Sequence, residues 1–60
     1  MRVLTLSELM RLPRIELRYL ERAMLIELGA MGEDDPDRAV AFANLRLIRT
    51  VLARRDLRPG

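Results

Sequence analysis

The chain has 60 residues, a net charge of +2 at pH 7, and neither Cys nor His. A domain of this size buries only about 60% of the surface that its unfolded chain exposes, so its stability is marginal. Half of the residues are apolar, which excludes a disordered chain. The lack of Cys and His excludes a disulfide framework, a thiolate nucleophile and a zinc site built on these residues. We therefore expect association to add stability, and we expect no cofactor, no metal and no enzymatic activity.

The sequence offers no segment that is suited to a membrane or to export. The longest uninterrupted apolar run, residues 23–26, is far shorter than the ~20 residues that span a bilayer. Glu8 and Arg11 interrupt the N-terminal apolar stretch, which a signal peptide would keep intact. We expect a cytoplasmic protein without a membrane partner.

Start and stop signals predict a short N-terminal helical turn followed by a long helix. Thr5 and Glu8 have the spacing of a capping box, which favours a helical turn beginning after Thr5. Pro13 disfavours helix at the residue before it and suits the first position of a new helix. We expect this first helix to span about residues 13–30, where two nearby glycines end it.

A second long helix is expected after a loop over residues 31–35. Asp35 followed by Pro36 is a strong start signal, because Asp caps a helix and Pro suits its first position. This second helix should span about residues 36–56. Its start is acidic and the rest of it is basic, an order that suits the helix dipole.

Together these elements predict an all-α fold, a two-helix antiparallel hairpin in a single domain over residues 1–60. Each helix carries an apolar arc that is wider than the stripe needed to pack against one neighbour. We expect no third element to cover both arcs, so the hairpin should form a homodimer, a four-helix bundle. The alternative is a monomer with exposed Leu and Met side chains.

Polar residues interrupt both apolar arcs, and we expect them to pair inside the core and to fix the register of the helices. In this interpretation Glu16 pairs with Arg54 or Arg55, and Asn44 binds Glu27 or a backbone group. Glu16 and Glu27 do not form a catalytic acid–base pair, because eleven helical residues separate them by about 16 Å. The predicted polar core consists of Glu16, Glu27, Asn44 and Arg55.

The outward faces of both helices carry Arg, and the second also carries the only Phe. A bulky aromatic among planar cations is typical of a binding anchor, although burial at an oligomer seam is an open alternative. The Arg residues are equally consistent with a solvated face in a protein from a GC-rich genome. The first helix has a basic stripe of Arg11, Arg14, Arg18 and Arg22, and the candidate partner-binding residues on the second are Arg38, Phe42, Arg46 and Arg49.

Two classes of function remain. The first is a small protein-interaction module with a protein partner, such as an inhibitor, an antiactivator or an adaptor of the kind that phages and mobile elements encode. Its features are the short chain, the wide apolar arcs and the adaptable Met side chains. The alternative is a nucleic-acid-binding accessory protein that uses the Arg-rich second helix against phosphates.

One local resemblance accompanies the second class. Residues 47–55 resemble the second helix of the small two-helix protein of the bacterial large ribosomal subunit, and residues 8–12 with Glu16 and Leu17 are similar to the start of that family. The central aromatic stretch of the family is missing here, the connection is shorter, and Lys is absent. The resemblance covers about a third of the chain, and we do not assign the chain to this family.

Overall fold

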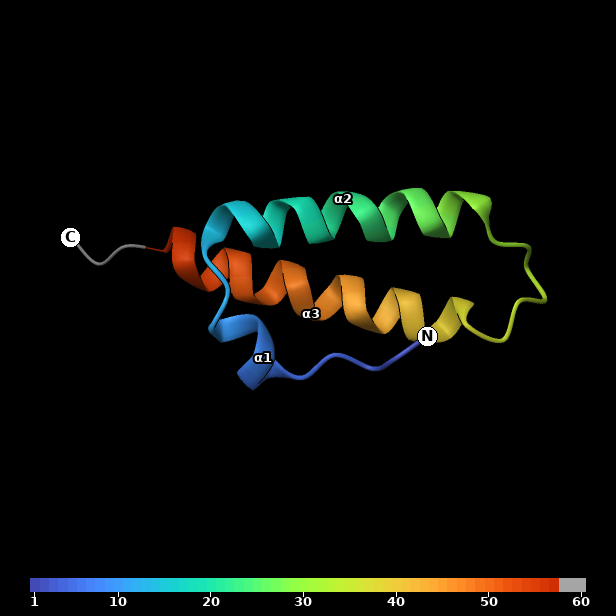
Figure 1. Cartoon of the computed structure of the whole chain (residues 1–60), viewed down its shortest axis with the longest axis horizontal. Coiled ribbons are helices and arrows are strands. Elements are labelled where there is room, and N and C mark those ends of the chain that lie inside the picture. The colour runs from blue at the N-terminus through green and yellow to red at the C-terminus, as the bar shows by residue number, and fades with distance from the viewer. Residues whose placement is uncertain (58–60) are drawn as a thin grey trace.

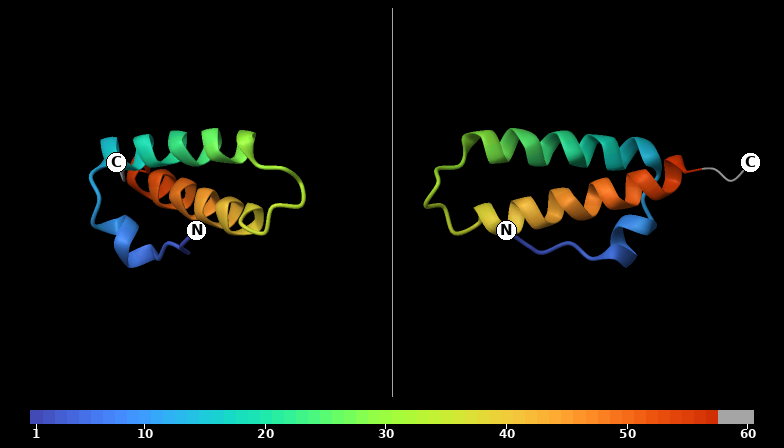
Figure 2. Two further views of the ribbon diagram at one scale, coloured as in Figure 1. Left: turned by 45° about the vertical axis from the view of Figure 1, so that its right-hand side comes forward. Right: turned by 180° about the vertical axis from the view of Figure 1, so that it is seen from behind.

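The computed structural model describes residues 1–57, and this part of the chain consists of helices without a strand. The helices are α1 (Leu6–Met10), α2 (Arg14–Ala30) and α3 (Arg38–Asp56). Figures 1 and 2 show that α2 and α3 lie side by side and run in opposite directions, while α1 and the N-terminal segment lie along α3. The all-α prediction is confirmed, and assembly into a four-helix bundle stays a prediction. The last three residues of the predicted domain lie outside the described residues.

The helix starts follow local signals in the sequence. The Thr5 hydroxyl oxygen accepts from the Glu8 amide at 3.2 Å, and the same hydroxyl donates to the Glu8 carboxylate at 3.0 Å. The Arg2 guanidinium, 2.6 Å from that carboxylate, and the Thr5 hydroxyl lower the pKa of Glu8 from its ordinary value. The carboxylate therefore stays ionised where the amino end of α1 favours a negative charge.

The start of α3 lies two residues later than predicted, at Arg38, because residues 36–37 form a turn. Asp35 was expected to cap the helix, and its carboxylate accepts from the Asp37 amide at 2.8 Å. The Arg38 amide then donates to the Asp35 carbonyl at 3.1 Å, and Arg38 is the first residue of α3. Short polar side chains that bind the backbone two residues further on make this kind of turn.

The core consists of two apolar clusters along the length of the molecule. The first joins α1, α2 and α3, and the second lies nearer the loop between α2 and α3. Met24 packs against both clusters and so connects them. The buried residues are Leu9, Leu17, Ile48, Val51 and Leu52 in the first cluster, and Leu28, Ala41 and Leu45 in the second.

The N-terminal helical turn was predicted, but its packing against α3 as a third element of the core was not. Leu9 of α1 is 1% exposed in the first cluster, and Leu4 and Leu12 pack against the same cluster. Part of the apolar surface of α3 is therefore covered within one chain. Within residues 1–57 none of the helices is both long and apolar enough to cross a bilayer.

Arg55, near the end of α3, holds the carboxyl end of α1. Its guanidinium donates to the Leu12 carbonyl, and also to the Met10 carbonyl at 2.6 Å. Carbonyl groups at the end of a helix lack partners within that helix, so a cation that reaches them satisfies them. The expected pairing of Arg55 with Glu16 is therefore corrected, because the guanidinium is directed to α1 and Glu16 is exposed.

Replacing Arg55 with Gln is expected to lower the free energy of unfolding by about 1–2 kcal/mol, because partly exposed hydrogen bonds from a cation are lost. The matched control is Arg54→Gln, since Arg54 is an exposed neighbour on the same turn of α3. Urea denaturation of both variants gives the comparison. Equal midpoints for the two variants would show that the contact between Arg55 and α1 contributes nothing to stability.

Candidate partner-binding face

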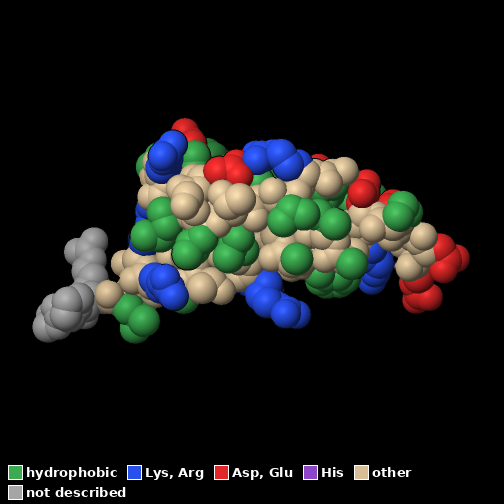
Figure 3. All heavy atoms as spheres, turned by 90° about the horizontal axis from the view of Figure 1, so that it is seen from below, with side chains coloured by type: hydrophobic (Ala, Val, Ile, Leu, Met, Phe, Trp, Pro, Cys, Tyr) green, Lys and Arg blue, Asp and Glu red, His purple; other side chains and the backbone are tan. Residues whose placement is uncertain are grey.

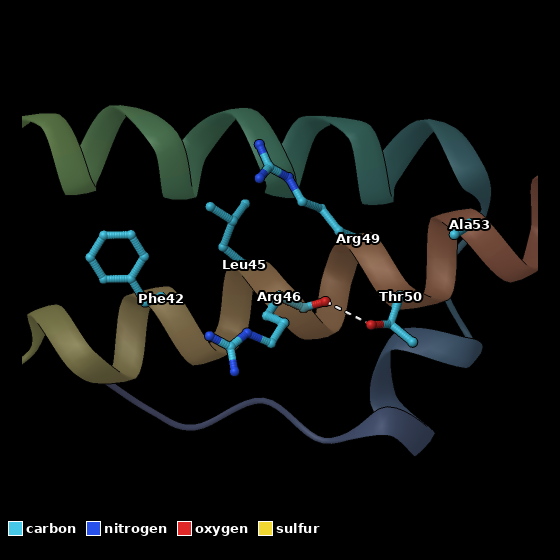
Figure 4. A pocket seen from close by; sticks show the side chains of 6 residues that line it. All are labelled: Phe42, Leu45, Arg46, Arg49, Thr50 and Ala53. Carbon is cyan, nitrogen blue, oxygen red and sulfur yellow. Dashed lines mark hydrogen bonds between the residues drawn. The ribbon is translucent and has the colours of Figure 1, made fainter.

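One face of α3 carries a shallow depression with a volume of about 460 Å³ (Figure 4). Residues three and four positions apart lie on the same side of a helix, which is why this set comes together. The small side chain of Ala53 leaves space at one end, and the ring of Phe42 stands at the other. The depression is lined by Phe42, Leu45, Arg46, Arg49, Thr50 and Ala53.

The ring of Phe42 lies beside the guanidinium of Arg38. The guanidinium carbon of Arg38 lies 5.2 Å from the centroid of the ring, within the range of a cation–π contact. The side chain nevertheless remains 46% exposed. An exposed aromatic side chain beside a cation is suited to serve as an anchor for a partner.

The other two predicted cations line the same depression but differ in their partners. Arg49 points towards α2 in Figure 4, and its Nε donates to the Glu21 carboxylate at 3.2 Å. Its side chain still has 56% of its surface exposed, so Arg49 lies at the rim of the depression with its charge paired to α2. Arg46 is exposed, and no ion pair joins it to another residue within positions 1–57. The structure thus brings together all four residues predicted for this face.

Leu45 and Thr50 complete the face, although the sequence analysis did not include them among the candidates. Leu45 is 5% exposed and belongs to the second core cluster, so it forms a fixed apolar part of the depression. The Thr50 hydroxyl donates to the Arg46 carbonyl at 2.9 Å, within α3 itself. Leu45 lies three positions after Phe42 and Thr50 lies four positions after Arg46, and this spacing in the sequence could have placed both residues on the same side of the helix.

The predicted basic stripe is partly neutralised by ion pairs. Arg14 lies 3.0 Å from the Asp56 carboxylate, and Arg18 lies 3.7 Å from the same carboxylate. Arg18 also lies 3.4 Å from Glu21, the partner of Arg49. Most of these contacts join α2 to α3, so this part of the stripe serves the packing of the two helices. The other two members are exposed, Arg11 in the turn after α1 and Arg22 on α2.

Besides Arg55, the predicted polar core is corrected at Glu16 and Glu27, while Asn44 is buried as predicted. Glu16 and Glu27 are exposed, because α2 packs through Leu17 and Leu28. Neighbouring helical residues are turned by about 100°, so the two carboxylates lie to the side of the core-facing stripe. Asn44 is 1% exposed and satisfies its amide with backbone groups, one of the alternatives expected from the sequence.

Asn44 holds the N-terminal segment against α3. Its side-chain oxygen accepts from the Leu4 amide at 2.9 Å, and its side-chain nitrogen donates to the Arg2 carbonyl at 3.0 Å. A single side chain thereby replaces the donor and acceptor that a neighbouring strand would supply. The N-terminal segment and α1 lie below α3 in Figure 1, and the close-up of the Phe42 face shows none of them in front of it.

Charge is distributed unevenly along the molecule. Figure 3 shows Asp and Glu side chains at the end formed by the loop between α2 and α3, and Arg, apolar and further acidic side chains along the rest of the face in view. Glu33 and Asp34 are the exposed acidic residues of that loop. Phe42 is the fifth residue of α3 and follows this loop closely, so the acidic loop adjoins one end of the Phe42 face.

Comparison with known proteins identifies no relative: no family model, no curated protein and no solved structure matches the chain. The resemblance of residues 47–55 to a ribosomal helix therefore gains no support from a match.

Proposed function

We propose that the chain is a small, non-enzymatic protein-interaction module that binds an acidic, amphipathic segment of a protein partner through the Phe42 face of α3. The observation that carries this proposal is a half-exposed Phe42, in contact with Arg38, beside a depression with Arg at its rim. An apolar anchor with Arg side chains beside it complements an apolar side chain flanked by carboxylates. The proposed role is that of an inhibitor, an antiactivator or an adaptor of the kind that phages and mobile elements encode.

The form of the depression favours a protein over a small molecule. All six lining residues come from α3, so the depression has no opposite wall. Small-molecule sites enclose most of their ligand between several elements. A partner helix or extended segment would supply the missing wall itself, as in helix recognition by a groove.

The nucleic-acid alternative is less favoured because many Arg side chains are already engaged. Arg2, Arg14, Arg18 and Arg49 face carboxylates of the same chain, and Arg55 faces backbone carbonyls. Phosphate binding depends on the number of cations that neutralise phosphates, and each internal ion pair competes with such a contact. Strong salt dependence remains the property that distinguishes this alternative.

The proposal predicts that Phe42→Ala weakens binding by at least about 30-fold, the effect of losing a central anchor of about 2 kcal/mol. The probe is an acidic amphipathic peptide selected from a displayed library on the intact chain, with affinity measured by calorimetry. The matched control is Tyr19→Ala, since Tyr19 is an aromatic residue of α2 that is 66% exposed. Arg46→Ala is expected mainly to slow association and to reduce its salt dependence.

Three outcomes would contradict the proposal. The first is equal binding by the Phe42→Ala and Tyr19→Ala variants. The second is loss of the helical circular-dichroism signal in Phe42→Ala, which would assign Phe42 to the core. The third is tighter binding of DNA or RNA than of any selected peptide, with a salt slope that falls by about one for each Arg removed.

A further inference from the structure

The surface of α2 that faces away from α3 carries an apolar stripe that the monomer leaves open. Ile15, Tyr19 and Ile26 are 62%, 66% and 64% exposed, and they lie within about 40° of one another on the helix. The exposed small residues Ala23 and Ala30 continue the stripe. Around Tyr19 the surface is hollowed by a depression of about 370 Å³, lined by Leu12, Glu16, Tyr19, Leu20 and Ala23. Contiguous apolar surface of this kind marks an interaction site.

The two edges of this α2 stripe carry opposite charges. At about 100° per residue, Glu16 and Glu27 lie on one side of Tyr19, and Arg18 and Arg22 lie on the other. Within residues 1–57 no ion pair joins Arg22, Glu16 or Glu27 to another side chain. The stripe therefore has a basic edge and an acidic edge whose charges are only partly compensated inside the chain.

We propose that a second copy of this chain covers the stripe, with the two α2 helices parallel about a twofold axis. In a parallel pair, the basic edge of each copy meets the acidic edge of the other on both sides of the seam. In an antiparallel pair, like edges meet and repel. Arg22 precedes Glu27 by five residues, an axial offset of about 7.5 Å, which is the offset that edge ion pairs bridge in parallel two-stranded coils.

The same arrangement accounts for the side chains within the seam. In register, Tyr19 and Ile26 each pack against their own copies, and Ala23 and Ala30 let the backbones approach. The 17 residues of α2 form a seam about 25 Å long, so the interface is at the small end of specific protein interfaces. We expect a dimer whose dissociation constant is micromolar or higher. Its surface is separate from the Phe42 face of α3, so partner binding and dimerisation can fail independently.

Charge reversal across the seam tests the proposal. Sedimentation equilibrium of the intact chain at about 10 μM to 1 mM should show a monomer–dimer equilibrium. Arg22→Glu and Glu27→Arg should each raise the dissociation constant about 5-fold or more, because each removes two interfacial ion pairs. An equal mixture of these two variants should associate again, because each altered charge then faces its complement. Arg54→Glu, an exposed charge reversal on α3, should leave the equilibrium unchanged.

A single cysteine tests the orientation, since the chain has no Cys of its own. In a parallel dimer in register, Ala30→Cys places the two thiols next to each other, and mild oxidation should give a covalent dimer. An antiparallel pairing centred on α2 would hold them about 25 Å apart, too far for a disulfide. The proposal would be overturned if the chain is still monomeric at 1 mM, or if the mixture of the two charge-reversed variants does not associate. It would also be overturned if Ala30→Cys gives no covalent dimer while its helical circular-dichroism signal is kept.

Discussion

Replacing Leu9 with Ala lowers the free energy of unfolding by about 2–5 kcal/mol, the largest loss that we expect from a single substitution outside α2 and α3. Leu9 is 1% exposed and belongs to the first core cluster with Leu17, Ile48, Val51 and Leu52. Truncation would leave a cavity between all three helices, because α1 is short and fixed at both ends by Thr5 and Arg55. Urea denaturation followed by circular dichroism measures the loss.

The matched control is Leu6→Ala in the same short helix. Leu6 is 40% exposed, so the substitution removes the same atoms from a site that water already reaches, and a change within about 1 kcal/mol is expected. Equal losses at the two positions would mean that α1 does not dock on α3. In that case the apolar surface of α3 would be open, and the covered and uncovered faces described above would need to be reassigned.

Replacing Asn44 with Ala is expected to lower the free energy of unfolding by about 1–3 kcal/mol, because a buried amide and a buried carbonyl lose their partner. Leu4 and Arg2 supply these two backbone groups. The substitution should also release the Leu4 amide to hydrogen exchange with water, since its acceptor is removed. Exchange measured by NMR reports this local opening separately from global unfolding.

Thr50→Ala provides the control for Asn44. Thr50 is an exposed residue of α3 whose hydroxyl donates only to the carbonyl one turn earlier in the same helix, so its removal should change stability by less than about 0.5 kcal/mol. Asn44→Leu is also informative, because it keeps the volume and removes both hydrogen bonds. If Asn44→Leu is as stable as the native chain, the contact with the N-terminal segment is not a stabilising one.

The role of Asn44 bears on which face is free to bind. By holding residues 2–4 against α3, Asn44 directs α1 to the side on which Leu9 joins the core. The Phe42 face, turned to another side of the same helix, is left open (Figure 4). The internal contacts of the N-terminal segment therefore decide which surface of α3 is available to the proposed partner.

Local sequence signals were sufficient to predict that the helices form, although α3 begins two residues later than expected, and to predict contacts made within one turn. The Thr5 and Glu8 pair, the interruption before Pro13 and the turn at Asp35 depend on backbone groups that lie within a few residues of one another. The placement of Arg38 near Phe42 belongs to the same class, because side chains four positions apart are neighbours on any helix. Such interactions do not depend on how the helices later pack.

The docking of α1, the partners of Asn44 and the exposure of Glu16 and Glu27 were decided by the tertiary structure. Asn44 binds backbone groups 40 and 42 residues away, and Arg55 reaches one 43 residues away. Periodicity identifies an apolar arc but not its centre, and an arc that covers half of a helix allows several packing directions. Only the contact between α2 and α3 fixes that direction, and it leaves Tyr19 and Ile26 outside the core while it buries Leu17 and Leu28.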